Sequence, residues 1–268
     1  MINLNRNKKG ELIEATGKRT RQSSIYIPDQ KEDFKISRSK FSDFLLCKKC
    51  FYLDRVKGLR SPGMPGWSLN ETTDLLLKKE FDECRRMQLP HRLFMDNGLD
   101  YLVPFQHPDI DKWRDSLRHG LISRFKKTNI ILSGGVDDIW LDTRNNKLVI
   151  ADYKSQASNF EPEQGYYLSG VYHQAYKIQM DFYAYLLKQM KFKVSPSSYF
   201  LVCNANRHAD GFGGRMIFSE TLIEYKYSTK WIPDRVQEMI NVMNNDEIPL
   251  SNPSCENCAY AKERSLIE

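Results

Sequence analysis

The chain has 268 residues, with 40 Lys and Arg against 34 Asp and Glu, and therefore a formal net charge of +6. Apolar residues make up 41% and charged residues 28%, a composition typical of a globular protein. No stretch approaches the roughly 20 apolar residues that a membrane-spanning helix needs, and residues 1–6 contain no apolar signal core. We therefore expect a cytoplasmic protein rather than a secreted or membrane-spanning one.

The first 33 residues are predicted to form a flexible basic tail. Residues 1–22 contain six basic and two acidic side chains, a net +4, which leaves only +2 for the remainder of the chain. This segment has few large apolar residues, and they do not recur with the spacing of a helix or a strand. It is either a solvated terminus or an arm that binds nucleic acid through its charge.

Residues 34–268 are predicted to form one α/β domain. Periodicity and turn signals predict a helix that starts at residue 39 and further helices over about 68–87, 113–125, 171–190 and 231–244. Strands are predicted over 136–142, 147–154, 199–203 and 216–227, with a hairpin turn at residues 144–146. This order of elements indicates a mixed sheet with helices around it.

The helix over 68–87 places a carboxylate in the middle of its predicted apolar face. That face consists of Leu69, Thr73, Leu76, Glu80, Cys84 and Met87. The opposite side is charged and consists of Lys78, Lys79, Asp82, Arg85 and Arg86. A buried Glu80 needs a hydrogen bond, an ion pair or a bound cation. An ordinary salt bridge at the edge of the face is the alternative.

The predicted hairpin gathers further charge at one end of the sheet. Asp152 and Lys154 alternate onto one face of their strand, and the turn brings Asp137 or Asp138 opposite them. The pattern does not choose between these two aspartates, because a shift of one residue exchanges their faces. Two carboxylates beside an ammonium group suit a hard cation such as Mg²⁺ or Mn²⁺.

Three motifs in this order resemble a known family. They are Gly134-Gly135-Val136-Asp137-Asp138-Ile139, Ile150-Ala151-Asp152-Tyr153-Lys154-Ser155, and Gln179 with Tyr183 one helical turn later. Together they resemble the RecB-like branch of the PD-(D/E)XK nuclease superfamily, over about residues 36–262. The resemblance implies a restriction-endonuclease-like core, in which helices flank a central mixed sheet.

The resemblance also implies roles for individual residues. Asp137, rather than Asp138, and Asp152 would bind Mg²⁺ or Mn²⁺, and Lys154 would be the catalytic lysine. Glu80 would supply a further acidic ligand from the first core helix, and the Tyr153 carbonyl another. Gln179 and Tyr183 would position the substrate and the catalytic strand.

Four cysteines form two pairs near the two ends of the predicted domain. Cys47 and Cys50, like Cys255 and Cys258, are separated by two residues and together supply four soft ligands. We expect them to join segments 39–60 and 250–264 in one lobe. Similarity to CRISPR-associated RecB-like exonucleases and to the AddB nuclease domain implies a [4Fe–4S] cluster. Zinc remains an alternative, because those families have one early and three late cysteines, whereas this chain has two early and two late ones. The other two, Cys84 and Cys203, are expected in the core.

The resemblance implies a metal-dependent deoxyribonuclease that acts on DNA ends or single strands in repair, recombination or defence, in some cases within a larger complex. DNA contacts would come from basic side chains on the surface, helped by stacking on Phe51 or Tyr52. These basic residues are Lys48, Lys49, Arg55, Lys57 and Arg60. Two alternatives are a non-catalytic DNA-binding or scaffolding protein with the nuclease fold, and a structural zinc protein with an ordinary ion-pair network.

Overall fold

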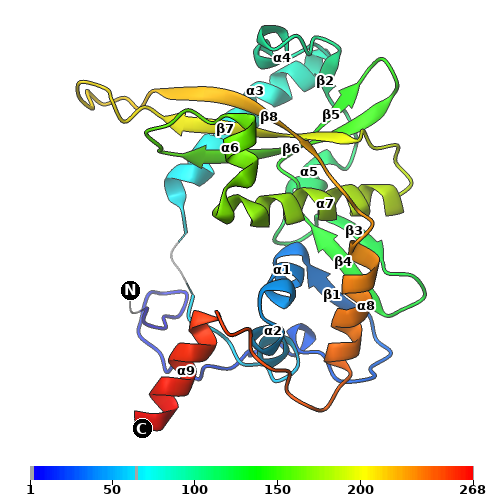
Figure 1. Ribbon diagram of the computed structural model, residues 1–268, viewed down its shortest axis with the longest axis vertical. Helices are drawn as coiled ribbons and strands as arrows, with labels where there is room; N and C mark the ends of the chain where they lie inside the picture. The colour runs from blue at the N-terminus through cyan, green and yellow to red at the C-terminus, as the bar shows by residue number, and fades with distance from the viewer. Residues whose placement is uncertain (1–2, 64–65, 268) are drawn as a thin grey trace. The chain divides into compact units, whose positions relative to one another are not determined.

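The computed structural model describes residues 3–63 and 66–267 (Figure 1). The chain divides into two compact units. One, here called the cysteine unit, consists of Met1–Gly66, Arg124–Ile131 and Pro233–Glu268. The other, here called the sheet unit, consists of Trp67–Ser123 and Leu132–Ile232. None of the helices in the described residues has both the length and the apolar composition to cross a membrane.

The sheet unit contains a five-stranded sheet with the order β2-β5-β6-β7-β8. Its strands are β2 (Leu102–Pro104), β5 (Asp138–Asp142), β6 (Lys147–Gln156), β7 (Ser197–Ala205) and β8 (Phe218–Lys226). Strands β6 and β7 are parallel, whereas the other neighbouring pairs are antiparallel. The chain between β6 and β7 includes the long helix α7 (Gln174–Gln189), as a parallel connection requires. The predicted mixed α/β architecture is confirmed.

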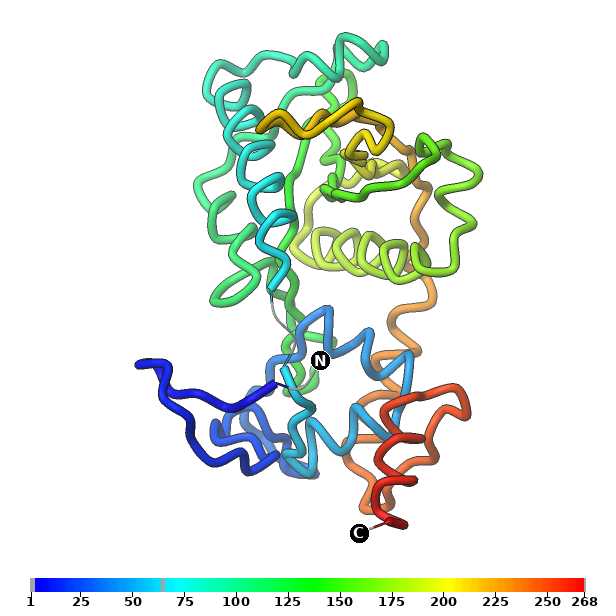
Figure 2. The backbone as a smooth tube through the Cα atoms, turned by 90° about the vertical axis from the view of Figure 1, so that its left-hand side faces the viewer, coloured from blue at the N-terminus to red at the C-terminus, as the bar shows by residue number. Residues whose placement is uncertain are grey.

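Helices cover the two faces of this sheet, and alternation along β6 shows which helix lies on which face. Val149, Ala151 and Tyr153 belong to one apolar cluster with Phe81 of α3 (Ser68–Met87). Asp152, which alternates with them, is hydrogen-bonded to α7. Figures 1 and 2 show α3 in cyan and α7 in yellow-green as two separate helices beside the strands. The carboxylate of β6 is thus on the α7 side of the sheet.

Helix α3 has the predicted bounds, but its buried face differs from the predicted one. Leu77, Phe81 and Arg85 are its buried residues, whereas Leu69 and Leu76 are more than half exposed. The helix is therefore turned by about one residue, or 100°, relative to the prediction. The three consecutive leucines at 75–77 allow either orientation. The periodicity of the apolar residues does not reveal that an arginine with an ion-pair partner is buried on the core side of this helix.

The predicted helix over 113–125 is wrong. Helix α5 (Ile110–Arg114) ends early, and strand β3 (Leu121–Arg124) follows. The Asp115 carboxylate accepts hydrogen bonds from the backbone amides of residues 117 and 118. Gly120 then has a φ of +79°, which a continuing helix excludes. A local side-chain cap and one left-handed residue therefore turn the chain where its apolar pattern suggested helix.

The remaining elements are short or lie near the chain ends. A second sheet has the order β1-β4-β3, with β1 at Phe34–Ser37 and β4 at Ile130–Gly134. The helices are α1 (Arg38–Leu46), α2 (Lys48–Arg55), α4 (Arg92–Asp96), α6 (Gln164–Ser169), α8 (Ile232–Met243) and α9 (Glu256–Ile267), with 3₁₀ turns at Gln22–Ser24 and Val171–His173. The Ser37 side chain caps α1 by accepting from the Lys40 amide, so the helix begins one residue before its predicted start at residue 39.

Candidate active site and cysteine centre

The register of the β5–β6 hairpin distinguishes the two adjacent aspartates. Asp138 is paired with Ala151, so one step back Asp137 comes level with Asp152. Asp137 Oδ2 also accepts a hydrogen bond from the Tyr153 amide at 2.8 Å. Since residues opposite each other share a face of the sheet, Asp137 faces the same side as Asp152 and Asp138 faces the other. The structure therefore supplies the register that the sequence pattern left open.

Asp152 is wholly buried and is held from two sides. Its Oδ1 accepts a hydrogen bond from Gln179 Nε2 at 2.6 Å, and Gln179 Nε2 also donates to the Tyr183 hydroxyl at 3.1 Å. Its Oδ2 forms an ion pair with Lys154 but has no aligned hydrogen-bond donor among the described residues. Five of the six predicted catalytic residues, including Asp137, thus come together at one end of the sheet.

The electrostatics of this group disfavour two free carboxylates side by side. Burial raises the pKa of Asp152 to about 7; the Lys154 ammonium opposes this shift, and the nearby Asp137 carboxylate adds to it. Burial lowers the pKa of Lys154, but Asp152 and Asp137 outweigh burial and raise it overall. Lys154 is therefore charged at neutral pH, yet one ammonium does not neutralise two carboxylates. A divalent cation would supply the missing charge.

The sixth predicted residue, Glu80, has its contacts elsewhere. Glu80 Oε2 lies 3.2 Å from both His91 Nε2 and Arg92 Nη2, and the Glu80 side chain is 48% exposed. Arg92 also pairs with Glu220 at 2.6 Å. Glu80 therefore forms an ordinary salt bridge, which was the alternative to metal binding that the sequence left open. The structure does not bring Glu80 together with Asp137 and Asp152.

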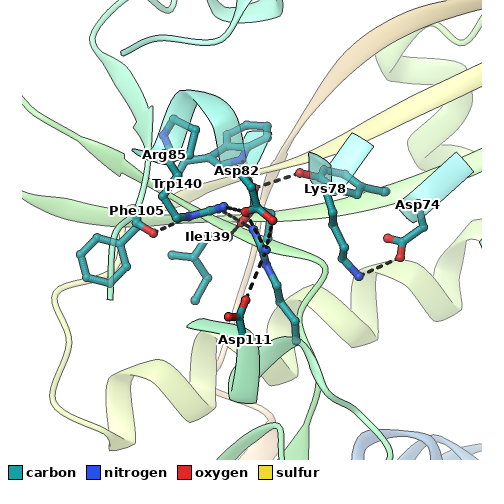
Figure 3. Close-up of polar contacts among 12 residues, drawn as sticks. Asp74, Lys78, Asp82, Arg85, Phe105, Asp111, Ile139 and Trp140 are labelled. Atoms are coloured by element: carbon teal, nitrogen blue, oxygen red, sulfur yellow. Dashed lines mark hydrogen bonds and ion pairs between the residues drawn. The ribbon is translucent and has the colours of Figure 1, made fainter. Parts of the chain in front are cut away.

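A different carboxylate of α3, which the sequence pattern did not predict, approaches the group. Asp74 lies close enough to Asp137 that, after burial, the Asp137 charge is the next cause of the raised pKa of Asp74. Its Oδ2 accepts a hydrogen bond from Lys78 at 2.7 Å, as Figure 3 shows. Its Oδ1 is buried, with no hydrogen-bond partner among the described residues. Asp74 precedes Leu77 and Phe81 by three and seven residues, a helical spacing that would have identified it had the buried face been known.

Asp74, Asp137 and Asp152 fit a hard divalent cation. All three offer carboxylate oxygens, the donors that Mg²⁺ and Mn²⁺ prefer. Asp74 Oδ1 is buried without a hydrogen-bond donor, and such an atom is costly unless a cation or water satisfies it. The Tyr153 carbonyl also lies beside Lys154, whose Nζ is 3.5 Å away. These donors have the chemistry that a catalytic metal site requires.

An aromatic side chain supports Lys154 from α7. The Lys154 ammonium lies 4.7 Å from the centre of the Tyr176 ring, a cation–π distance. Tyr176 in turn stacks on His173, and His173 stacks on Tyr167 with ring centres 4.1 Å apart. The sequence does not predict this role for Tyr176, because helical spacing does not reveal a cationic neighbour.

Behind the candidate site lies an ion-pair network of two arginines and two aspartates, part of which Figure 3 shows. Asp138, which is fully buried, pairs with Arg85 of α3 and with Arg114 of α5, and both arginines also pair with Asp82. The Asp138 carboxylate also accepts from the Tyr153 hydroxyl at 2.9 Å. This network fixes both hairpin strands immediately beside Asp137 and Tyr153.

The predicted DNA-contacting surface of the cysteine unit needs correction at three residues. Arg55 is buried and paired with Asp54, so it is not a solvent-facing cation. Phe51 and Tyr52 are fully buried, and the Tyr52 hydroxyl donates to the backbone carbonyl of residue 245. Neither ring is available for stacking on a base. The remaining predicted residues are exposed or partly exposed, namely Lys48, Lys49, Lys57 and Arg60.

The four paired cysteines do come together in the cysteine unit, as predicted. The Sγ atoms of Cys47, Cys50, Cys255 and Cys258 all lie within 4.8 Å of one another, and none is in a disulfide. Burial raises the pKa of Cys47, but hydrogen bonds from the backbone and neighbouring thiols outweigh it and lower the pKa to about 7. This group could hold a metal ion or a cluster. Of the other two cysteines, Cys203 is buried as expected and Cys84 is only partly buried.

Comparisons with known proteins bear on the whole chain. A sequence model of the PD-(D/E)XK nuclease superfamily matches residues 35–262, which is most of the chain. No curated protein matches it. A crystal structure from Eubacterium rectale, described as a "Putative exonuclease", shares 12% identity with a TM-score of 0.40, over 89% of this chain and 88% of that one. That TM-score is too low for the likeness to bear on function.

Proposed function

This chain belongs to the PD-(D/E)XK nuclease superfamily, and we propose that it is a metal-dependent nuclease that hydrolyses phosphodiester bonds of DNA. The observation that carries the proposal is the meeting of two strand carboxylates with a half-buried lysine, with a third carboxylate close to one of them. Asp137 and Asp152 are level on neighbouring strands, Asp74 approaches Asp137 from α3, and Lys154 is paired with Asp152. A plain ion-pair network would not leave the buried Oδ1 of Asp74 without a donor.

Asp74, Asp137 and Asp152 are the proposed ligands of Mg²⁺ or Mn²⁺, with the Tyr153 carbonyl as a further donor. The bound metal supplies a water of lowered pKa and a positive charge beside the scissile phosphate. In this assignment Asp74 takes the role that the sequence suggested for Glu80. The exchange is motivated by the contacts of Glu80 with His91 and Arg92 and by the unpartnered Oδ1 of Asp74.

The other side chains bind and orient. The Lys154 ammonium stabilises negative charge that develops on the phosphate, or holds the attacking water by donating to it. Gln179 donates to Asp152 Oδ1, whereas Oδ2 is paired with Lys154. Tyr183 accepts from the same amide of Gln179, and Tyr176 supports the ammonium of Lys154 through its ring. Their proposed role is to hold the reacting groups in place rather than to transfer protons.

We further propose that the protein acts on DNA ends or single strands. Its proposed role is in repair, recombination or defence in the cytoplasm, as part of a larger complex. The family membership supports a nucleic-acid substrate. A non-catalytic DNA-binding protein is the second candidate, and it predicts binding without cleavage. The filled set of carboxylates and lysine favours catalysis.

Cleavage of labelled single-stranded and duplex DNA in Mg²⁺ or Mn²⁺ tests the proposal. We expect Lys154→Ala and Asp74→Asn to lower the cleavage rate at least a hundredfold, and Glu80→Gln, a matched change on the same helix, to keep it within about threefold. Equal background cleavage by the unaltered chain and by Lys154→Ala would refute the enzyme assignment. Loss of cleavage in Glu80→Gln alone would return the metal-ligand role to Glu80.

A further inference from the structure

The sulfur atoms of the cysteine centre lie unusually close together. Cys50 Sγ is 3.5 Å from Cys255 Sγ and 3.3 Å from Cys258 Sγ, and Cys47 Sγ is 3.8 Å from Cys258 Sγ. All four sulfurs lie within 4.8 Å of one another. From this spacing we propose that the cysteines hold one tetrahedral zinc ion and not a [4Fe–4S] cluster.

The two centres require different spacings of their sulfur ligands. Four thiolates on one zinc ion have Zn–S bonds of about 2.3 Å, and a tetrahedron of that size has sulfur–sulfur edges of about 3.8 Å. In a [4Fe–4S] cluster each cysteine binds a different iron, and inorganic sulfides lie between the irons. The cysteine sulfurs of such a cluster must therefore be farther apart than the ligands of a single ion. The observed spacing matches the single ion and leaves no room for the cluster.

The backbone shapes both cysteine pairs in the same way. Cys47 is the N-cap of α2 and Cys255 directly precedes α9, so each pair encloses the first turn of a helix. In each pair the amide four residues after the first cysteine donates to its carbonyl at 3.0 Å. The backbone amides of Cys50 and Asn252 interact with the Cys47 sulfur and favour its thiolate form, the form that binds a metal. Helix N-termini also stabilise thiolates.

A side-chain hydrogen bond joins the two loops that carry the cysteines. Asn252 Nδ2 donates to the Leu46 carbonyl at 2.8 Å, and the Cys255 amide donates to the Asn252 carbonyl at 3.0 Å. Asn252 is therefore linked to the residue before Cys47 and to Cys255. Such supporting bonds hold ligand loops in position around a metal.

The donor set also identifies the ion and its role. Among the described residues, the group contains four thiols and neither histidine nor carboxylate. Zinc bound by four cysteines is a closed structural site, because no position is left open for water or substrate. The proposed zinc is therefore separate in role from the metal proposed at Asp137 and Asp152, and its presence does not depend on nuclease activity.

The metal content of the unaltered full-length chain, purified anaerobically in reducing buffer, tests this proposal. We expect colourless protein with about one zinc per chain, and zinc-edge X-ray absorption that fits four sulfur neighbours at about 2.3 Å. Iron with acid-labile sulfide, a single iron without sulfide, or protein with no bound metal would each overturn it. This measurement needs no variant and is independent of whether the chain cleaves DNA.

Two matched variants test which thiols bind the ion. Cys50→Ser should lower the zinc retained after dialysis against a chelator at least tenfold, as expected when a ligand to the metal is lost. Cys84→Ser, the same change at a thiol outside the group, should retain about one zinc per chain. Equal retention in the two variants would contradict the assignment of Cys50. If Cys50→Ser fails to fold, the absorption spectrum of the unaltered chain still decides between zinc and the cluster.

Discussion

The neighbouring residues Asp137 and Asp138 differ in what satisfies their charge. Asp138 is fully buried, but two arginines, a tyrosine hydroxyl and a backbone amide satisfy its carboxylate. Asp137 lies beside two other carboxylates and accepts a hydrogen bond from the Tyr153 amide, but no cationic side chain forms an ion pair with it among the described residues. One aspartate therefore stabilises the fold, whereas the other is held in a position that favours a bound cation. A one-residue difference along a strand separates these two roles.

Asparagine substitutions of the two aspartates should have opposite consequences. Asp138→Asn leaves buried arginines without their full counter-charge, and we expect it to lower the free energy of unfolding by about 3–5 kcal/mol. Asp137→Asn removes a repulsion and keeps an acceptor for the Tyr153 amide. It should leave the free energy of unfolding within about 0.5 kcal/mol or raise it, yet abolish Mg²⁺-dependent cleavage. Urea unfolding without divalent metal and a cleavage assay measure the two effects. Equal destabilisation by both variants would show that the two roles are not separated.

At the scale of elements, the segment between β4 and β5 determines where Asp137 is held. Gly135 packs directly against the backbone of Ser116, because a Cβ at Gly135 would lie 2.7 Å from the Ser116 Cα and 2.5 Å from its Cβ. No side chain fits there without a shift of the chain. Since Asp137 follows only two residues later, a shift at Gly135 would move a proposed metal ligand.

Gly135→Ala should therefore affect both stability and cleavage. We expect the free energy of unfolding to fall by about 1–3 kcal/mol, as for other overpacked sites, and the cleavage rate to fall ten- to hundredfold because Asp137 is displaced. Gly165→Ala is the matched control, since a Cβ at Gly165 in α6 would have no neighbour within 4 Å. That control should be as active as the unaltered chain and slightly more stable. Equal activity of the two variants would mean that the segment tolerates movement.

The helices and strands also show how much of the fold could be predicted from the sequence. The hairpin and the positions of Asp152 and Lys154 could be predicted. Side chains alternate between the two faces of a long strand, and this fixes which residues share a face. The bounds of α3 could be predicted as well, but its orientation could not. Three adjacent leucines permit two buried faces, and the one adopted buries Arg85 against Asp138, a partner 53 residues away. Asp74 was missed for this reason, since its place in the site depends on the same rotation.

At the scale of the whole molecule, the cysteine centre ties together segments far apart in the chain. Cys50 and Cys255 are 205 residues apart, and both belong to the cysteine unit, whereas the proposed catalytic residues all belong to the sheet unit. A link that closes a loop of this size restricts the unfolded chain strongly, by about 5 kcal/mol for a covalent bond. The sheet unit has its own apolar core around Phe81 and Trp140. Metal binding should thus stabilise the two units unequally.

Hydrogen exchange of the full chain, with and without the cysteine-bound metal, measures this difference. We expect metal removal to lower the protection of amides in α2 and α9 by a hundredfold or more, because metal binding contributes directly to the folding of its ligand segments. Amides of β6 and β7 should change by less than about threefold, because their protection arises from the core of the sheet unit. The Cys84→Ser variant, treated in the same way, should respond like the unaltered chain. A uniform loss of protection would show that the two units unfold together, and the cysteine centre would then stabilise the proposed catalytic carboxylates as well as the chain ends.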